Sequence, residues 1–192
     1  MTNLNSRDNF THRLYADKAD VKAGTAPRLA VLEEQHPVVA CIQHRADKFL
    51  GSMATGVFEI TGLDRYSVSH KVRPHVDAAL EPLKDKRTGR LFNRRTSFFV
   101  YVYASPDLEG GETFFPHISM PDKTAFNSSF IESRNNASGA PALAVKPFTG
   151  SAIFWIGLKP DGSPDARTVH EGLPVRRGDK IGMNIWAKHY LD

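Results

Sequence analysis

The sequence predicts a mainly β protein with supporting helices, arranged as a double-stranded β-helix or jelly roll. Many short segments rich in β-branched and aromatic residues are separated by turn signals. One amphipathic helix precedes nearly all of them, and no internal repeat or linker divides the chain. The 192 residues suit one large domain. We therefore expect a single domain over residues 1–192, in which residues 1–36 stay unassigned apart from the option of a short helix.

Residues 37–50 carry the clearest helical pattern in the chain. Pro37 stands at a plausible first helical position, and Gly51 is a natural end. Cys41 lies within this apolar pattern, so we expect a buried and unreactive thiol. The apolar residues that recur at helical spacing are Val38, Val39, Ile42, Ala46, Phe49 and Leu50.

Extended segments follow the helix at short intervals. The strongest, residues 97–103, is β-branched and aromatic almost throughout, so we expect both of its faces to be covered. Two polar stretches, 81–95 and 119–141, lack clear periodicity and are expected to be loops. The remaining segments expected to be extended are 57–60, 63–72, 112–115, 142–146, 151–158, 168–170 and 180–187.

Composition excludes several classes of function. The net charge is +4 and the isoelectric point is near 9.2, but the basic residues are scattered, so we expect no nucleic-acid partner. No apolar run reaches the roughly 18 residues of a membrane span, and the first eight residues do not resemble a signal peptide. The default compartment is therefore the cytoplasm.

The single cysteine excludes an internal disulfide and a multi-thiolate zinc site. The oligomeric state stays open.

The segment from Arg73 to Asp77 contains a possible half of a metal site. In an extended segment, His75 and Asp77 would project to the same side. Such a pair alone is more often a surface feature. His170, at the end of a later extended segment, would supply a third ligand where a jelly roll brings distant strands together. Two imidazoles and one carboxylate form the facial arrangement found in non-haem Fe(II) oxygenases.

An ordered series of motifs extends this pattern along the chain. It resembles the catalytic domain of the prolyl 4-hydroxylases, within the Fe(II)- and 2-oxoglutarate-dependent dioxygenases, over roughly residues 37–192. The ten-residue step from His170 to Lys180 also matches this family. The motifs are His75-Val76-Asp77, Gly110 to Pro116, Val145 to Ala152, His170 to Val175 and Gly178 to Trp186.

The resemblance implies Fe(II), 2-oxoglutarate and O2 as cofactor and cosubstrates, with ascorbate as reductant. Oxidative decarboxylation of 2-oxoglutarate to succinate would accompany hydroxylation of an unactivated C–H bond. In the implied site, Lys180 pairs with the distal carboxylate of 2-oxoglutarate, and Tyr66 and Thr113 belong to the same pocket. The implied metal ligands are His75, Asp77 and His170, and the implied substrate-binding residues are Arg95 and Trp186.

A prolyl residue in a peptide or protein is the substrate that the resemblance implies first. Lys188 departs from the residue type expected for peptidyl-proline recognition, and the region before the helix is short for the family. A small-molecule biosynthetic oxygenase, a jelly-roll binding module without turnover, and a hydrolase or cupin-type enzyme using another metal therefore remain alternatives. In a fold like that of the family, the stretches 81–95 and 119–141 would lie beside the opening of the active site and influence substrate choice.

Overall fold

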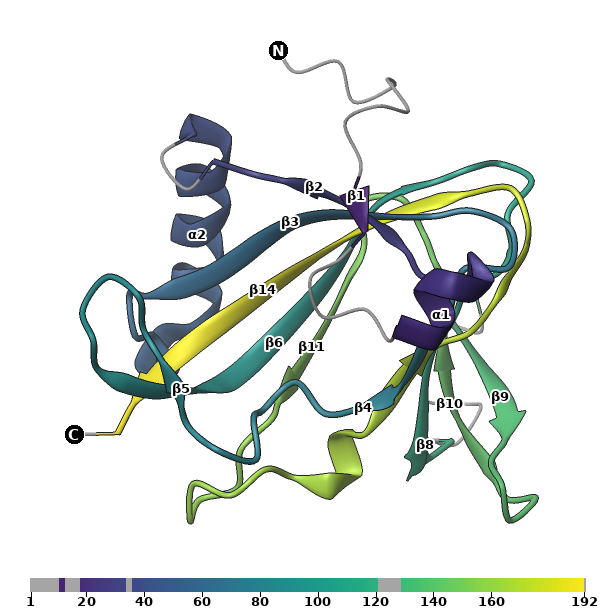
Figure 1. The fold of residues 1–192 in the computed structure, drawn as a ribbon. Helices are drawn as coiled ribbons and strands as arrows, with labels where there is room; N and C mark the ends of the chain where they lie inside the picture. The colour runs from purple at the N-terminus through teal and green to yellow at the C-terminus, as the bar shows by residue number, and fades with distance from the viewer. Residues whose placement is uncertain (1–10, 13–17, 34–35, 121–128, 192) are drawn as a thin grey trace.

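Two antiparallel sheets form the body of the protein. The structure is a computed structural model that describes residues 11–12, 18–33, 36–120 and 129–191 (Figure 1). The large sheet has the order β1-β2-β3-β14-β6-β11, with β5 paired to β6, and the small sheet has the order β4-β12-β8-β10-β9. Every strand pair in these sheets is antiparallel, which confirms the predicted jelly-roll class.

The large sheet contains β1 (Thr11–His12), β2 (Arg28–Val31), β3 (Phe58–Tyr66), β5 (Leu83–Lys84), β6 (Leu91–Ala104), β11 (Ala152–Ile156) and β14 (Lys180–Tyr190). The small sheet contains β4 (Val72–His75), β8 (Thr113–Ser119), β9 (Ile131–Asn135), β10 (Pro141–Val145) and β12 (His170–Gly172). A third, two-stranded sheet pairs β7 (Glu109–Gly110) with β13 (Val175–Arg177). The helices are α1 (Lys18–Ala23), α2 (Pro37–Leu50), η2 (Gly51–Met53) and η3 (Ala166–Thr168).

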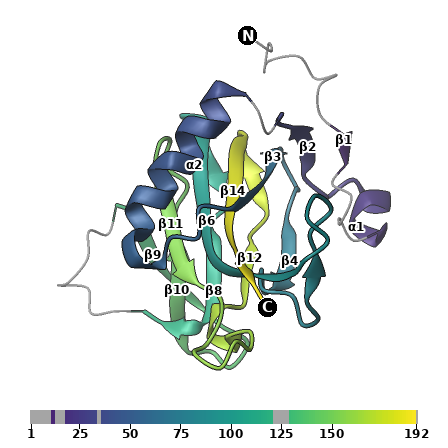
Figure 2. The ribbon, with the colours of Figure 1, turned by 90° about the vertical axis from the view of Figure 1, so that its left-hand side faces the viewer.

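Helix α2 has the predicted bounds and covers one face of the large sheet (Figure 2). It ends before Gly51, whose φ of 55° lies in the region that favours glycine. The predicted buried stripe is partly wrong, because Val38 and Phe49 are 57% and 64% exposed. The helix turns Val39, Ala46 and Leu50 toward the sheet instead, and the Phe49 ring only borders it.

The Cys41 side chain is exposed, so the prediction of a buried thiol is wrong. Cys41 follows the buried Val39 by two residues, which is about 200° around a helix. An apolar residue type within a helical pattern therefore does not establish which side of the helix it occupies.

Strand β6 contains the strongest extended segment that the sequence predicted, residues 97–103, and it is longer than expected. Phe98 is buried in the cluster under α2, whereas Phe99 is buried between the two sheets. The expected cover on both faces holds in this middle part but not at the end, because Val102 and Tyr103 are exposed. The beginning of β6 lies in the predicted 81–95 loop, where it forms a hairpin with β5.

The predicted extended segment 63–72 is interrupted by a turn. Strand β3 ends at Tyr66, and His70 Nδ1 accepts a hydrogen bond from the Ser67 amide at 3.2 Å. Ser69 has a φ of 72°, a conformation incompatible with a continuous strand. The turn moves the chain from the large sheet to the small sheet, so that β4 begins the small sheet rather than extending β3.

Other strand boundaries also differ from the sequence prediction. Strand β8 continues beyond Pro116 to Ser119, because the proline lies where the pairing with β10 shifts register. The predicted loop 119–141 contains β9, although residues 121–128 lie outside the described part of the chain. Strand β2 was not predicted.

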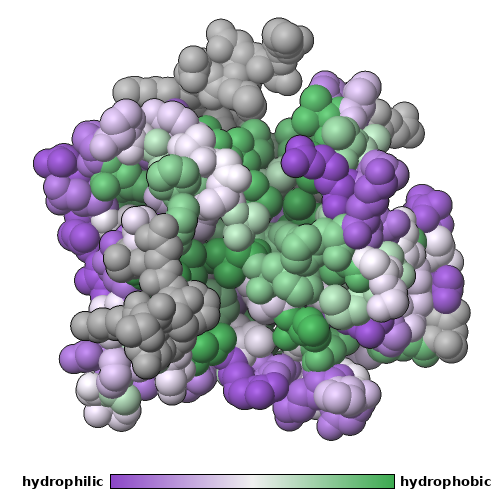
Figure 3. All heavy atoms as spheres, turned by 180° about the vertical axis from the view of Figure 1, so that it is seen from behind, coloured by the Kyte–Doolittle hydropathy of each residue, from purple (hydrophilic) through white to green (hydrophobic). Residues whose placement is uncertain are grey.

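Apolar side chains form one cluster between α2 and the large sheet and another between the two sheets. Figure 3, which views the molecule from the side of α2, shows apolar surface among hydrophilic areas. No helix in the described part of the chain is long and apolar enough to cross a membrane. The single-domain boundary and the compartment stay predictions.

Candidate metal and cosubstrate site

The pairing of β4 with β12 brings the two predicted histidines together. His170 is the register partner of His75, and their ring centroids are 4.4 Å apart. Asp77 follows the end of β4 by two residues. Its Oδ1 atom lies 3.6 Å from His75 Nε2 and 4.0 Å from His170 Nε2. The three side chains thus offer ligand atoms within 4.8 Å of one another, as the sequence predicted.

Backbone carbonyl groups orient both imidazole rings. His75 Nδ1 lies 2.8 Å from the Arg73 carbonyl oxygen, and His170 Nδ1 lies 3.0 Å from the Thr168 carbonyl oxygen. Because a carbonyl can only accept, each Nδ1 must carry the proton and donate. Each Nε2 then keeps its lone pair, which faces the cluster. Such an outer hydrogen bond is typical of metal-ligating histidines.

The charges in this cluster also suit a cation. Burial raises the pKa of Asp77, but the adjacent His75 and His170 side chains act in the opposite direction and hold this pKa below its usual range. Burial lowers the pKa of His170, which favours the neutral imidazole. Asp77 Oδ2 is buried and has no hydrogen-bond partner among the described residues. An ionised carboxylate with an unsatisfied oxygen beside two imidazole lone pairs fits a borderline divalent metal such as Fe(II).

A cavity lined by His75 and His170 extends to Lys180. The Lys180 side chain is fully buried, and its Nζ donates to the Gly111 carbonyl and lies 4.4 Å above the Tyr66 ring. Burial lowers the pKa of Lys180 to about 7, although Glu112 and Asp64 act in the opposite direction. A buried amine at the end of a cavity suits an anionic ligand group. The cavity is lined by Tyr66, Val72, His75, Phe99, Thr113, His170, Gly172, Lys180 and Asn184.

The structure brings together most of the predicted site residues. Tyr66 and Thr113 line the cavity with Lys180. The Thr113 hydroxyl lies 2.7 Å from the Tyr101 hydroxyl. Trp186 is on β14 with Lys180 but does not line the cavity, and Arg95 does not line it either.

Arg94, rather than its neighbour Arg95, contacts the predicted site. Its guanidinium group makes two hydrogen bonds to Glu59, at 2.7 and 3.0 Å, and lies 3.7 Å from the centre of the Trp186 ring. It also donates to the Asp77 carbonyl oxygen at 3.4 Å. The pairing of β14 with β6 shifts register between Ala187, which pairs with Thr96, and Lys188, which pairs with Arg94. This irregularity changes the side of β6 on which Arg94 and Arg95 lie.

Sequence reasoning also missed Asn184 as a residue of the cavity. Alternate residues of a strand share one face, so Asn184 could have been found from Lys180. Its amide donates to Asp64 Oδ2 at 3.4 Å, and both side chains are buried.

Gly182, between these two residues on β14, leaves room for an aromatic wall of the cavity. A Cβ atom at this position would lie 2.3 Å from Phe99 Cζ. Gly182→Ala is therefore expected to reduce the free energy of unfolding by about 1–3 kcal/mol and to weaken 2-oxoglutarate binding by displacing the Phe99 ring. Urea unfolding and calorimetry measure the two effects. Gly157→Ala is the control, because a Cβ there would meet only ordinary contacts at 3.5–3.7 Å. Equal stability of the two variants would refute this prediction.

A two-histidine, one-carboxylate cluster inside an antiparallel double sheet defines the class of non-haem iron oxygenases. Residues 61–188 match the family model of the 2OG-Fe(II) oxygenase superfamily. The chain belongs to this superfamily.

The chain is also similar to several prolyl 4-hydroxylases. Prolyl 4-hydroxylase 1 of Arabidopsis thaliana is 27% identical over 171 residues, which cover 89% of this chain and 55% of that protein. Probable prolyl 4-hydroxylase 3 of the same plant is 32% identical over 123 residues, which cover 63% of this chain and 39% of that protein. The chain therefore spans about half, or less, of the length of these curated relatives.

Two solved structures share the fold. The viral collagen prolyl hydroxylase of Paramecium Bursaria Chlorella virus-1, in its 2OG complex, aligns with a TM-score of 0.58 and 23% identity, covering 88% of this chain and 83% of that one. A Pseudomonas putida prolyl-4-hydroxylase aligns with a TM-score of 0.55 and 15% identity, covering 94% of this chain and 78% of that one. These likenesses establish the common architecture.

Proposed function

We propose that the protein is an Fe(II)- and 2-oxoglutarate-dependent oxygenase that hydroxylates a prolyl residue in a peptide or protein. The observation that carries this proposal is that two members of the His75, Asp77 and His170 cluster, the histidines, line the same cavity as the buried Lys180. A binding module without turnover needs neither group. A hydrolase using another metal at the same cluster would leave the buried amine without a role.

In this proposal, His75, Asp77 and His170 hold Fe(II) and leave coordination positions open. Fe(II) bound there would supply, with 2-oxoglutarate and O2, the oxidation of an unactivated C–H bond with release of succinate and CO2. Lys180 binds the distal carboxylate of 2-oxoglutarate, and Tyr66 and Thr113 orient the same cosubstrate. The apolar ring of Phe99 excludes water from the cavity, which strengthens the ion pair. Ascorbate serves as the reductant that maintains Fe(II).

The substrate assignment is supported by the printed names of the similar proteins and by the surroundings of Asp77. Arg94, held by Glu59 against the Trp186 ring, forms a wall beside the Asp77 carbonyl. Such a wall suits the backbone and ring of a peptidyl proline. We therefore assign substrate positioning to Arg94 in place of Arg95. Trp186 keeps its proposed role as an aromatic wall. A small-molecule substrate remains the second candidate.

The direct test is turnover with Fe(II), 2-oxoglutarate, O2 and ascorbate. We expect succinate formation and a mass gain of one oxygen atom on a proline-rich peptide. We expect no mass gain on the same peptide with alanine in place of proline. Tight 2-oxoglutarate binding without succinate on any peptide or small molecule would instead support the binding module and refute the proposal.

The pKa of Lys180 leads to a pH dependence of 2-oxoglutarate binding. A carboxylate needs the protonated amine, and the pKa of Lys180 in the cosubstrate-free protein is lowered by burial to about 7. Below this pH the amine is already charged. Above it, binding must take up a proton, so the Kd is expected to rise toward about tenfold per pH unit.

Calorimetry of 2-oxoglutarate binding to the Fe(II)-loaded protein, without oxygen and from pH 6.5 to 9, measures this dependence. Buffers that differ in ionisation enthalpy report the proton uptake. A Kd that does not change over this range would show that Lys180 keeps an ordinary lysine pKa.

A further inference from the structure

A hairpin of the large sheet carries a group of basic side chains that the oxygenase reaction does not use. It comprises residues 83–92, in which Leu83 pairs with Phe92 and Lys84 with Leu91. We call it the basic hairpin. Its only acidic residue, Asp85, is buried. The exposed basic residues of the hairpin are Lys84, Lys86, Arg87 and Arg90.

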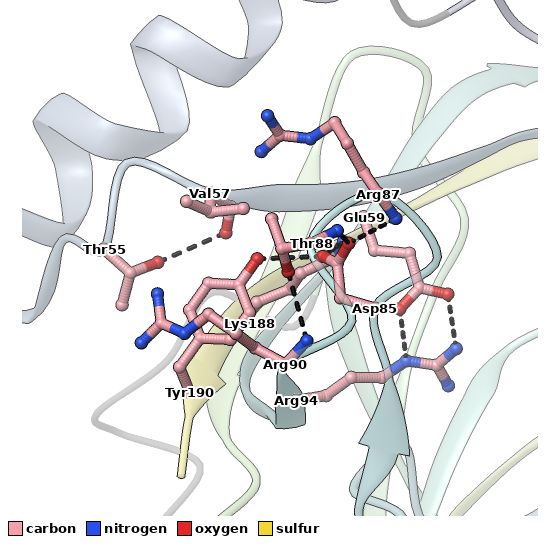
Figure 4. A network of polar contacts seen from close by, with 10 residues as sticks. All are labelled: Thr55, Val57, Glu59, Asp85, Arg87, Thr88, Arg90, Arg94, Lys188 and Tyr190. Carbon is pink, nitrogen blue, oxygen red and sulfur yellow. Dashed lines mark hydrogen bonds and ion pairs between the residues drawn. The ribbon is translucent and has the colours of Figure 1, made fainter. Parts of the chain in front are cut away.

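Asp85 fixes the basic hairpin to the last strand of the chain (Figure 4). Its Oδ1 accepts hydrogen bonds from the amides of Arg87 and Thr88, at 2.8 and 3.0 Å, which shapes the turn. Its Oδ2 accepts from Lys188 Nζ and the Tyr190 hydroxyl, each at 2.8 Å. The bonds from Lys188 and Tyr190 lower the pKa of Asp85 well below its usual range, so the carboxyl group stays ionised.

Three of the exposed cations of the hairpin, Lys84, Lys86 and Arg87, are not neutralised within the described part of the protein, whereas Arg90 lies over the Tyr190 ring. Asp85 already pairs with Lys188, a residue of β14. Lys84, Lys86 and Arg87 form no ion pair with the residues that the structure describes. The positive charge is therefore presented to solvent on a backbone whose shape is fixed, so little ordering would accompany the binding of an anion.

The base of the hairpin lies beside the metal-ligand cluster. The Asn93 side chain accepts from the Ala79 amide at 2.8 Å and donates to the Ala79 carbonyl at 2.9 Å, which closes the segment two residues after Asp77. Arg94, the next residue, donates to the Asp77 carbonyl. From this base, the cations extend roughly 10–20 Å along the hairpin, since a strand rises about 3.3 Å per residue. An extended peptide covers that distance with about three to six residues.

We propose that the basic hairpin binds an acidic segment of the peptide substrate, about three to six residues from the target prolyl residue. This inference rests on the proposed function, because it assumes that the target lies at the His75, Asp77 and His170 cluster. Each exposed ion pair contributes little alone, so several together are expected to improve kcat/KM by roughly tenfold. Salt screens such contacts, so the preference weakens at high ionic strength.

The test compares three proline-rich peptides that carry an acidic, neutral or basic block three to six residues from the proline, on either side of it. The wild-type Fe(II) protein is expected to bind the acidic peptide roughly tenfold more tightly than the neutral one, by fluorescence anisotropy, and to hydroxylate it at lower KM with similar kcat. The double variant Lys86→Glu and Arg87→Glu should prefer the basic peptide instead. These substitutions keep the backbone amides that bond Asp85.

The matched control is the double variant Lys18→Glu and Lys22→Glu. It makes the same change of charge on exposed residues of α1, which lies away from the hairpin (Figure 1). It should keep the preference for the acidic peptide. Equal binding of all three peptides by the wild-type protein, or an equal change in both double variants, would overturn the inference. Absence of succinate with every substrate would contradict the proposed function instead, and the anisotropy measurement would still decide the role of the hairpin.

Discussion

Asp77→Asn is expected to remove metal binding and turnover together. The carboxylate oxygen Oδ1 lies 3.6 and 4.0 Å from the Nε2 atoms of His75 and His170, and it belongs to the only anionic group in the cluster. Loss of an outer hydrogen bond to a metal ligand already costs about 10- to 100-fold in affinity or activity, so loss of a direct ligand should cost at least about 100-fold. Titration with Fe(II), followed by succinate assays, measures both quantities.

The same substitution is expected to leave the fold intact. Asparagine has nearly the same shape, and it removes a buried carboxylate whose Oδ2 has no hydrogen-bond partner among the described residues. The midpoint of thermal unfolding without metal should therefore stay close to that of the wild-type protein. Asp161→Asn, in an exposed turn, is the control for the chemical change. Wild-type Fe(II) affinity in the Asp77 variant would remove this residue from the metal site.

Lys180→Ala is expected to weaken 2-oxoglutarate binding by about 30-fold or more while Fe(II) binding stays unchanged. Truncating one partner of a buried, hydrogen-bonded charge pair costs about 2–5 kcal/mol, largely because the other charge is left unpaired. Lys180 is in the cavity but outside the cluster of proposed metal ligands. The dependence of turnover on 2-oxoglutarate concentration gives the first effect, and Fe(II) titration gives the second.

Two further variants separate charge from packing. Lys180→Met keeps most of the apolar chain but removes the Nζ atom that lies over the Tyr66 ring, and it should lose affinity as strongly as Lys180→Ala. Lys159→Ala removes a lysine at an exposed turn and should bind 2-oxoglutarate normally. An unchanged requirement for 2-oxoglutarate in both Lys180 variants would mean that another group holds the distal carboxylate.

The sequence was sufficient to predict that His75, Asp77 and His170 come together, because they stand in an ordered series of motifs that resembles a known family. The pairing of β4 with β12 then places His75 opposite His170. The bounds of α2 could also be predicted, since Pro37 and Gly51 act locally. The exposed side of α2 could not, because it depends on how the helix is rotated against the large sheet, and Cys41 shows the result.

Residues whose position depends on strand register were harder to predict. Arg94 and Arg95 are adjacent and chemically identical, and the register shift near Lys188 determines which of them reaches the Asp77 carbonyl. The turn after Tyr66 also determines the site, because it moves the chain into the small sheet. The two-residue alternation of side chains that predicts a strand can continue through such a turn, so the alternation does not show where the strand ends. Register and sheet assignment arise from pairing between distant segments, which a single sequence does not display.

The anchoring of the basic hairpin by Asp85 has a consequence for how this protein could diversify. Lys188 and Tyr190, which hold Asp85, lie at one end of β14, and Lys180 lies at the other. An inserted residue inside β14 would turn a whole row of side chains to the wrong face of the sheet. The exposed side chains of the hairpin can change without altering the backbone that Asp85 holds. New substrate preferences could therefore be selected, or engineered, in the hairpin while the oxidation chemistry is inherited unchanged.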